Sequence, residues 1–201
     1  MPRERKKLPI SCDAVDCEHG LHCFNATKEM KAKNRAGPCW QCGADLVDWD
    51  RIRTRNLADV AYTFKALKYE CVRHFFWHKT LNQRAINHAR RKGKRRLRDC
   101  VRRHLEQAIG PANPFRDGSQ TTMSDDVSTA IPYGRHATAT CCRKCLEFWH
   151  NIPQGVALAP EQLDYCAELV CLYIEDCIPE LTTEGEWIPP IRRQPGKCDE
   201  H

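Results

Sequence analysis

Five cysteines lie within the first 42 residues, and two of them have the spacing of a zinc knuckle. Cys39 and Cys42 are separated by two residues in GPCWQCG, which lets both thiolates reach one ion. A tetrahedral site needs two more ligands, and a C-x4-C pair precedes the knuckle. We therefore expect a closed zinc-ribbon or treble-clef-like site formed by Cys12, Cys17, Cys39 and Cys42. The alternative ligands for the second pair are Cys23, His19 and His22, and the alternative to a metal is two unrelated pairs of buried thiols.

A second group of donors lies in HATATCCRKCLEFWH, between His136 and His150. The C-x2-C unit of Cys142 and Cys145 lies between the two histidines, which gives a two-cysteine, two-histidine set for a second zinc ion. Cys141 could replace either histidine, so the fourth ligand is left open, and an open position would allow a metal-bound water. The alternative interpretation is a helix N-terminus with buried thiols and a capping histidine.

Cysteine is the outlying residue type, at 14 of 201 positions. No uncharged run approaches the roughly 18 apolar residues of a membrane span. The N-terminal sequence MPRERKKLPISC lacks the apolar stretch of a secretory signal. We therefore expect a cytoplasmic protein without membrane contact, whose thiols stay reduced and bind metal rather than form disulfides.

Apolar periodicity predicts helices to position these groups, and the expected fold is mostly helical with small zinc-stapled modules. A stripe with steps of three and four predicts one long helix over 56–78, with Asn56 as its N-cap. Cys71, His74 and His78 share that stripe, and we interpret them as core residues rather than ligands. The inward positions expected on this helix also include Leu57, Val60, Phe64 and Leu67.

Further helices are expected on both sides of a loop rich in Pro, Gly, Ser, Thr and Asp. One covers 81–92, is capped near Asn82, and is interrupted at Gly93 before a third helical run. A short helix is expected over 141–150, and Pro160 begins a longer one that reaches Cys177. The segments are thus a cysteine-rich zinc module (1–52), a helical segment (53–109), a long loop (110–135), the Cys/His cluster with an acidic helix (136–181) and an irregular tail (182–201).

Charge is concentrated rather than spread along the chain, whose net value is +6. Nine Lys or Arg residues and one acid lie between residues 90 and 103, whereas residues 147–191 hold nine acids and no Lys or Arg. Such a basic helix attracts polyanions and would bind phosphates without reading sequence. The expected nucleic-acid-binding residues are Arg90, Arg91, Lys92, Lys94, Arg95, Arg98 and Arg102. The alternative is a solvated face or pairing with the chain's own acidic helix.

The run HATATCCRKCLEFWHNIPQG, followed by LAPEQLDYCAELVCLYIE, resembles the C-terminal portion of an uncharacterised bacterial and phage family, a domain of unknown function. An upstream loop, NPFRDGSQTTM, is part of the resemblance, which covers about residues 81–181. The residues that it singles out are Asp117, Gly118, Gln120, His136, Cys141, Cys142, Cys145, Trp149 and His150. The N-terminal module, with CEHGLHCF and CGADLVDWDRI, resembles hypothetical zinc-ribbon-like bacterial proteins. The resemblance implies an architecture and no reaction.

Three functions follow as hypotheses. The first is a zinc-binding cytoplasmic protein that binds nucleic acid, either DNA or RNA, through the basic helix. The second is a metal-dependent hydrolase or nuclease, with His136 or His150 near an activated water and Asp117, Asp125 or Asp126 as ligand or base. The third is a zinc-stapled adaptor that binds a protein through the acidic helix, Trp187 or the Pro-rich tail. No hydrolase signature is complete, so the sequence assigns no catalytic residue.

Overall fold

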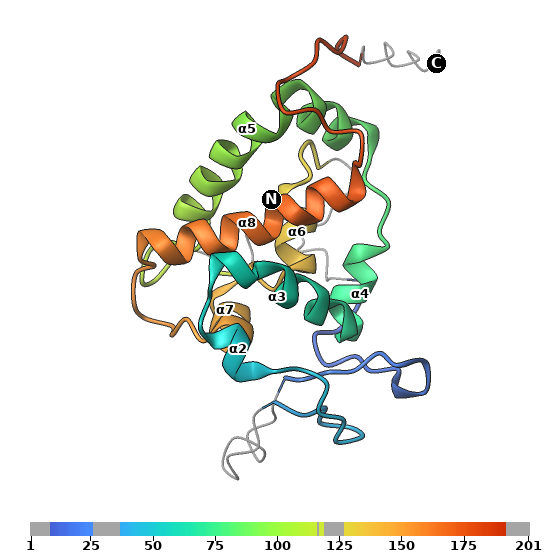
Figure 1. The fold of residues 1–201 in the computed structure, drawn as a ribbon, viewed down its shortest axis with the longest axis vertical. Helices are drawn as coiled ribbons and strands as arrows, with labels where there is room; N and C mark the ends of the chain where they lie inside the picture. Colours follow the sequence, from blue (N-terminus) through green and yellow to red (C-terminus); the bar gives the residue numbers. More distant parts are fainter. Residues whose placement is uncertain (1–8, 26–36, 116, 119–126, 192–201) are drawn as a thin grey trace, which may run out of the picture.

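The computed structural model describes residues 9–25, 37–115, 117–118 and 127–191, and within these ranges the chain is helical without a β-strand (Figure 1). The mostly helical fold class is therefore confirmed. The α-helices are α2 (Trp49–Arg53), α3 (Val60–Ala66), α4 (Cys71–Trp77), α5 (Gln83–Ala108), α6 (Ile131–Ala137), α7 (Arg143–His150) and α8 (Pro160–Cys177). The 3₁₀ helices are η1 (Cys17–His19), η2 (Leu57–Asp59) and η3 (Leu67–Tyr69). None of the described helices has both the length and the apolar character needed to cross a membrane.

Helix α8 runs across the middle of the molecule and packs against α5, α6 and α3 (Figure 1). It begins with Pro160, and the Gln162 side chain accepts a hydrogen bond from the backbone N–H of Ala159 at 3.0 Å. Pro is favoured in the first turn because its missing N–H has no intrahelical partner there. The expected start and end of this helix are both confirmed, and its buried positions include Leu163, Cys166, Val170 and Tyr173.

The prediction of a single helix over 56–78 is wrong, because this part of the chain forms four shorter elements, η2, α3, η3 and α4. The interruption lies at Glu70, which is extended (φ −85°, ψ 125°) and precedes α4. The His22 N–H donates to the Tyr69 carbonyl at 2.8 Å and the Cys71 N–H donates to the His22 carbonyl at 2.7 Å, so a distant segment takes over the helical hydrogen bonds. The Asn56 side chain does accept from the Ala58 N–H at 2.9 Å, as expected of a cap.

The inward stripe expected on that helix is only partly buried. Leu57 is 48% exposed and Phe64 is half-buried, whereas Leu67 and Phe76 have no exposed surface. Because η3 and the bend at Glu70 rotate α4 relative to α3, Phe76 rather than Phe64 reaches the centre of the core.

Helix α5 contains a kink at Gly93, where φ is +67°. The backbone N–H of Lys94 donates to the Thr182 carbonyl at 2.9 Å, and that of Glu186 donates to the Arg90 carbonyl at 3.0 Å. The segment after α8 therefore satisfies backbone groups that the kink removes from the helix. A Cβ atom on Gly93 would lie 2.4 Å from the backbone of Glu184, so the close approach requires glycine.

The N-terminal segment packs on the helical core through aromatic rings. The ring centroid of Trp49 lies 5.8 Å from that of Phe24 and 5.0 Å from that of Trp149, which belongs to α7. All three side chains are buried. Their contacts supply the core that the cysteine-rich segment is too short and too irregular to form alone.

Candidate metal centres

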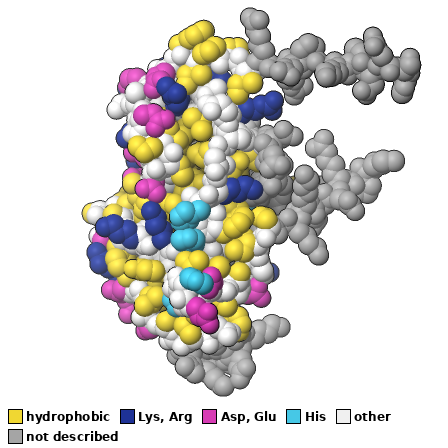
Figure 2. Space-filling view, turned by 90° about the vertical axis from the view of Figure 1, so that its right-hand side faces the viewer, with side chains coloured by type: hydrophobic (Ala, Val, Ile, Leu, Met, Phe, Trp, Pro, Cys, Tyr) yellow, Lys and Arg dark blue, Asp and Glu magenta, His cyan; other side chains and the backbone are white. Residues whose placement is uncertain are grey.

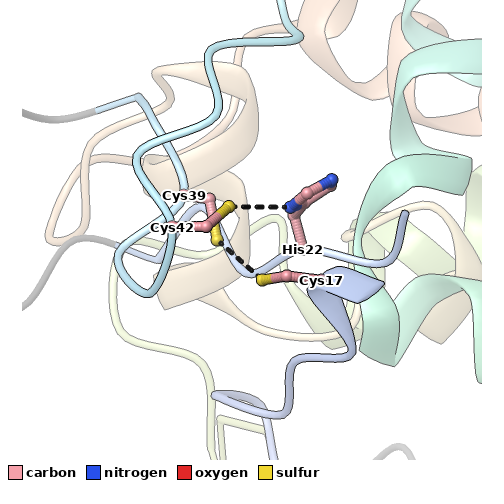
Figure 3. A group of neighbouring side chains, drawn as sticks. All are labelled: Cys17, His22, Cys39 and Cys42. Atoms are coloured by element: carbon pink, nitrogen blue, oxygen red, sulfur yellow. Dashed lines mark hydrogen bonds between the residues drawn. The ribbon is translucent and has the colours of Figure 1, made fainter. Parts of the chain in front are cut away.

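The first centre brings together Cys17, His22, Cys39 and Cys42, whose ligand atoms all lie within 4.8 Å of one another. Figure 3 shows the four side chains converging, with Cys17 Sγ 3.8 Å from Cys39 Sγ and Cys42 Sγ 3.4 Å from His22 Nδ1. Three thiols and one imidazole are a common donor set for a tetrahedral structural zinc ion. This group could therefore hold a metal ion.

Two tight turns present these donors. Gly20 (φ +74°) closes η1, so that the chain returns past Cys17 and the Asp16 and Leu21 backbones pair. In the knuckle, the Gly43 N–H donates to the Cys39 carbonyl at 2.8 Å. Burial alone would raise the pKa of the Cys39 thiol, but backbone hydrogen bonds and His22 outweigh it and lower the pKa to about 6. One thiolate is thus available near neutral pH, as metal binding requires.

Cys17, Cys39 and Cys42 lie together as the sequence suggested, but Cys12 is outside this group and His22 takes its place. His22 and Cys23 are neighbours in an extended stretch, where successive side chains point to opposite sides. His22 therefore faces the knuckle, while the Cys23 Sγ–H points to the Cys12 carbonyl at 3.5 Å. Cys23 and His19 are also outside the group, and the His19 ring contacts Asp16 Oδ1 at 2.8 Å.

The second centre contains Cys141, Cys142 and Cys145, whose sulfur atoms also lie within 4.8 Å of one another. Cys142 is the N-cap of α7 and Cys145 lies in its first turn, where the helix dipole and unpaired N–H groups favour thiolates. Hydrogen bonds with the Cys142 and Cys145 thiols hold the pKa of Cys141 well below its usual value. This group, too, could hold a metal ion.

A buried arginine supports the second centre. The Arg73 guanidinium donates to Cys145 Sγ at 3.2 Å, to the His136 carbonyl at 2.7 Å and to Glu70 Oε2 at 2.8 Å. Trp149 Nε1 donates to the same carboxylate oxygen at 2.8 Å. Burial opposes the charge on Arg73, yet the Cys145 thiol and Glu70 keep its pKa well above the usual value. This ion pair was not predicted from the sequence, although Glu and Arg three residues apart in an otherwise apolar segment are a detectable signal.

The two histidines expected at the second centre lie elsewhere in the core. The His136 ring stacks on Phe76 with the centroids 4.4 Å apart. The nitrogens of His150 lie 3.2 Å from the Tyr165 hydroxyl and 3.0 Å from the Thr138 carbonyl, and burial lowers the pKa of His150 to about 4. His150 lies five residues after Cys145 on α7, which separates the two by about 7.5 Å along the helix axis and about 140° around it, so one ion does not reach both. The structure therefore assembles the three cysteines without either histidine.

Acids from two segments of the chain cover much of the basic helix. Five of the seven residues expected to bind phosphates form ion pairs: Arg90 with Glu186, Lys94 with Glu175, Arg95 with Glu184, Arg98 with Glu168, and Arg102 with Asp164. Arg91 and Lys92 have no ion pair with an acid in the described part of the chain. Basic and acidic side chains are also interspersed on the face drawn in Figure 2, which is the right-hand side of Figure 1. The pairing with the acidic helix that the sequence offered as an alternative is thus present.

A hollow of about 520 Å³ lies between α5 and residues 127–132. Its lining includes His88, Arg103 and His104, and the buried Arg135 donates to His104 Nε2 at 3.2 Å. Burial and then the Arg135 charge lower the pKa of His104 to about 4. Arg103 is the cation of this lining, because the lowered pKa values of His88 and His104 keep both imidazoles neutral near pH 7.

Of the acids considered for a hydrolase, Asp117 lies in the described part of the chain and has a structural role. Both carboxylate oxygens of Asp117 accept the Arg143 backbone N–H, at 3.0 and 3.2 Å, so this residue caps the beginning of α7. Asp125 and Asp126 lie outside the described residues.

No solved structure matches this chain. Residues 61–175, which are more than half of the chain, match the family described as domain of unknown function (DUF4186). The matched segment contains Arg73, Glu70 and the second cysteine group, whereas the first centre precedes it. The expected resemblance to an uncharacterised family is confirmed, and the chain belongs to DUF4186.

Proposed function

We propose that this chain is a zinc-binding protein whose two thiolate-rich centres are structural and fasten the N-terminal segment to the helical domain. The observation that carries the proposal is the convergence of two separate donor groups, each with its ligand atoms within 4.8 Å. Thiolate and imidazole donors favour zinc over harder cations such as Mg²⁺ or Ca²⁺.

The surroundings of the second centre support a structural rather than a catalytic role. Its donors are thiols, Cys141 is buried, and Arg73 donates directly to Cys145. Two described residues considered for a hydrolytic site have other roles, since His136 stacks on Phe76 and Asp117 caps α7. Donor sets made only of thiolates are typical of structural zinc, whereas catalytic sites include histidine among their ligands.

Metal analysis of protein purified under reducing conditions tests this proposal. The wild-type chain is expected to hold two zinc ions, and Cys39→Ser/Cys42→Ser and Cys141→Ser/Cys145→Ser are each expected to hold one. Cys100→Ser is the matched control, because Cys100 is a half-buried thiol of α5 outside both groups. A wild-type protein without zinc, or double variants that still hold two ions, would refute the proposal.

A second candidate function is contact with nucleic acid through the face of α5 turned away from α8. Arg96 and Arg103 are exposed, lie seven residues apart and so share a helix face, and have no ion pair with an acid of the described chain. Arg103 also borders the hollow that contains His88 and His104. These cations support the proposal better than Arg95 or Arg102, which are already paired. Trp187 is exposed, so binding of a protein partner through this residue stays a prediction.

Salt-dependent binding of a labelled duplex and a labelled single strand tests the second candidate. If Arg96 and Arg103 contact phosphates, Arg96→Gln/Arg103→Gln is expected to reduce the slope of log K against log salt by about 0.9 per contact on a duplex. The control Arg95→Gln/Arg102→Gln removes the same charge from the paired face and is expected to change the slope less. Equal slopes for wild type and the Arg96/Arg103 variant would contradict the candidate.

A further inference from the structure

The second centre has three converging thiols, whereas a closed structural zinc site takes four ligands. The nearby histidines do not supply the fourth, because His136 stacks on Phe76 and His150 contacts Tyr165 and Thr138. A donor from another part of the chain would complete a closed site.

The N-terminal segment passes close to this centre. Backbone hydrogen bonds join His22 to Tyr69 and Cys71, which places the segment beside Glu70 at the start of α4. Cys23 is fully buried there, and its thiol points to the Cys12 carbonyl at 3.5 Å. Cys12 is thus held on the side of the segment opposite His22 and the first centre.

The groups around the Cys12 thiol belong to the second centre. Although Cys12 keeps an exposed side, partial burial raises the pKa of its thiol, and its strongest charged neighbour is Cys145, followed by Arg73, Cys141 and Glu70. The Cys12 sulfur is not within 4.8 Å of all three thiols, but the residue is exposed, so a rotation of its single χ1 angle or a small backbone shift can bring it inward.

We propose that Cys12 is the fourth thiolate ligand of a metal ion held by Cys141, Cys142 and Cys145. This inference rests on the proposed zinc-binding function and assigns the ligand that completes its second centre. Four thiolates around Zn²⁺ carry surplus negative charge, and Arg73 offsets part of it by donating to Cys145 Sγ.

The two centres would then share one short stretch of chain. Cys12 would bind in the second centre, while Cys17 and His22 bind in the first. The metal of the second centre would cross-link a segment that precedes the DUF4186 match to a cysteine group within it. The N-terminal segment would therefore be fastened to the domain at two points.

Cobalt titration of the full chain tests the ligand assignment, because Co²⁺ replaces Zn²⁺ and its sulfur-to-metal charge-transfer absorption grows with the number of bound thiolates. The background Cys39→Ser/Cys42→Ser disables the first centre, so the absorption reports on the second. Adding Cys12→Ser is expected to lower the charge-transfer intensity from that of four thiolates to that of three and to weaken Co²⁺ binding at least 10-fold. Adding Cys100→Ser is the matched control, because Cys100 is a half-buried thiol outside both groups, and it is expected to change neither quantity.

The outcomes separate this inference from the function on which it rests. A background protein that binds no Co²⁺ would overturn both the second centre and the role of Cys12. A protein that binds Co²⁺ with a spectrum and affinity unaffected by Cys12→Ser would overturn the role of Cys12 alone. If the background variant does not fold, Cys12→His in the otherwise wild-type chain decides the matter. It is expected to keep two bound ions and lose one thiolate signal, and an unchanged spectrum would refute the assignment.

Discussion

Replacement of Arg73 by methionine tests whether the buried ion pair supports both the fold and the second centre. Methionine keeps an unbranched side chain of similar length but removes the guanidinium that joins Glu70, the His136 carbonyl and Cys145. Glu70 would then be left as a buried carboxylate whose remaining side-chain donor is Trp149 Nε1.

The expected cost follows from the burial of the pair. The side chains of Arg73 and Glu70 are 4% and 2% exposed, so water does not solvate the charge that remains. Removing one partner of such a pair costs about 3–5 kcal/mol. The matched control is Arg95→Met, because the Arg95–Glu184 pair is 68% and 59% exposed, and breaking such a pair costs about 0–1 kcal/mol.

Urea unfolding of the zinc-loaded proteins measures the free energies of unfolding of Arg73→Met and Arg95→Met. The double variant Arg73→Met/Glu70→Gln completes the test. Because it removes both charges and leaves Trp149 an acceptor, it is expected to be more stable than Arg73→Met alone. Loss of the Arg73 hydrogen bond to Cys145 is also expected to weaken metal binding at the second centre by about 10–100-fold. An Arg73→Met variant within about 1 kcal/mol of wild type would refute the argument.

Three further changes have outcomes that the structure predicts. Gly93→Ala is expected to cost at least about 1–3 kcal/mol from backbone strain, and thermal melts should show a larger loss than for Gly155→Ala, since Gly155 also has positive φ but open space around it. Phe76→Ala is expected to cost about 3–5 kcal/mol in urea unfolding, and more than Phe64→Ala, because only Phe76 is fully buried; equal losses would contradict this packing. The pKa of His150 is about 4 in the folded protein and about 6.5 in the unfolded chain, so the unfolded chain takes up the proton first as the pH falls. The free energy of unfolding should therefore decrease by about 3 kcal/mol between pH 6.5 and pH 4. His150→Gln should flatten that pH dependence relative to wild type and to the exposed control His78→Gln, and an unchanged profile would show that His150 does not contribute.

Local signals in the sequence predicted the ends of several helices correctly. Asn56 and Asn82 cap through their side chains, Pro160 begins α8, and Gly93 interrupts α5. Each of these residues acts on the backbone within a few positions of itself, so neighbouring residues are enough to identify it. The overall helical class follows from the same short-range patterns.

The donor sets were harder to predict because they depend on pairings between distant segments. The backbone bridge between His22 and Glu70 breaks the expected long helix and also turns His22 toward the knuckle. Neither effect is visible in the residues around Cys12 and Cys17. At the second centre, the spacing of His136 and His150 resembled a ligand pattern, but the helical rise of α7 and the stacking on Phe76 place both rings elsewhere.

Most of the positive charges on α5 that were expected to bind phosphates form ion pairs with acids of the same chain. Helix α8 supplies acids along one side, and the kink at Gly93 lets the segment after α8 approach closely enough for Glu184 and Glu186 to pair with Arg95 and Arg90. A continuous helix would keep its own backbone hydrogen bonds and would not accept that segment, because a side chain at position 93 meets Glu184. The glycine that interrupts the basic helix is therefore also the residue that allows its charge to be neutralised. A polyanion would have to bind the cations outside this contact, which is why Arg96 and Arg103, rather than the paired arginines, are the residues to test.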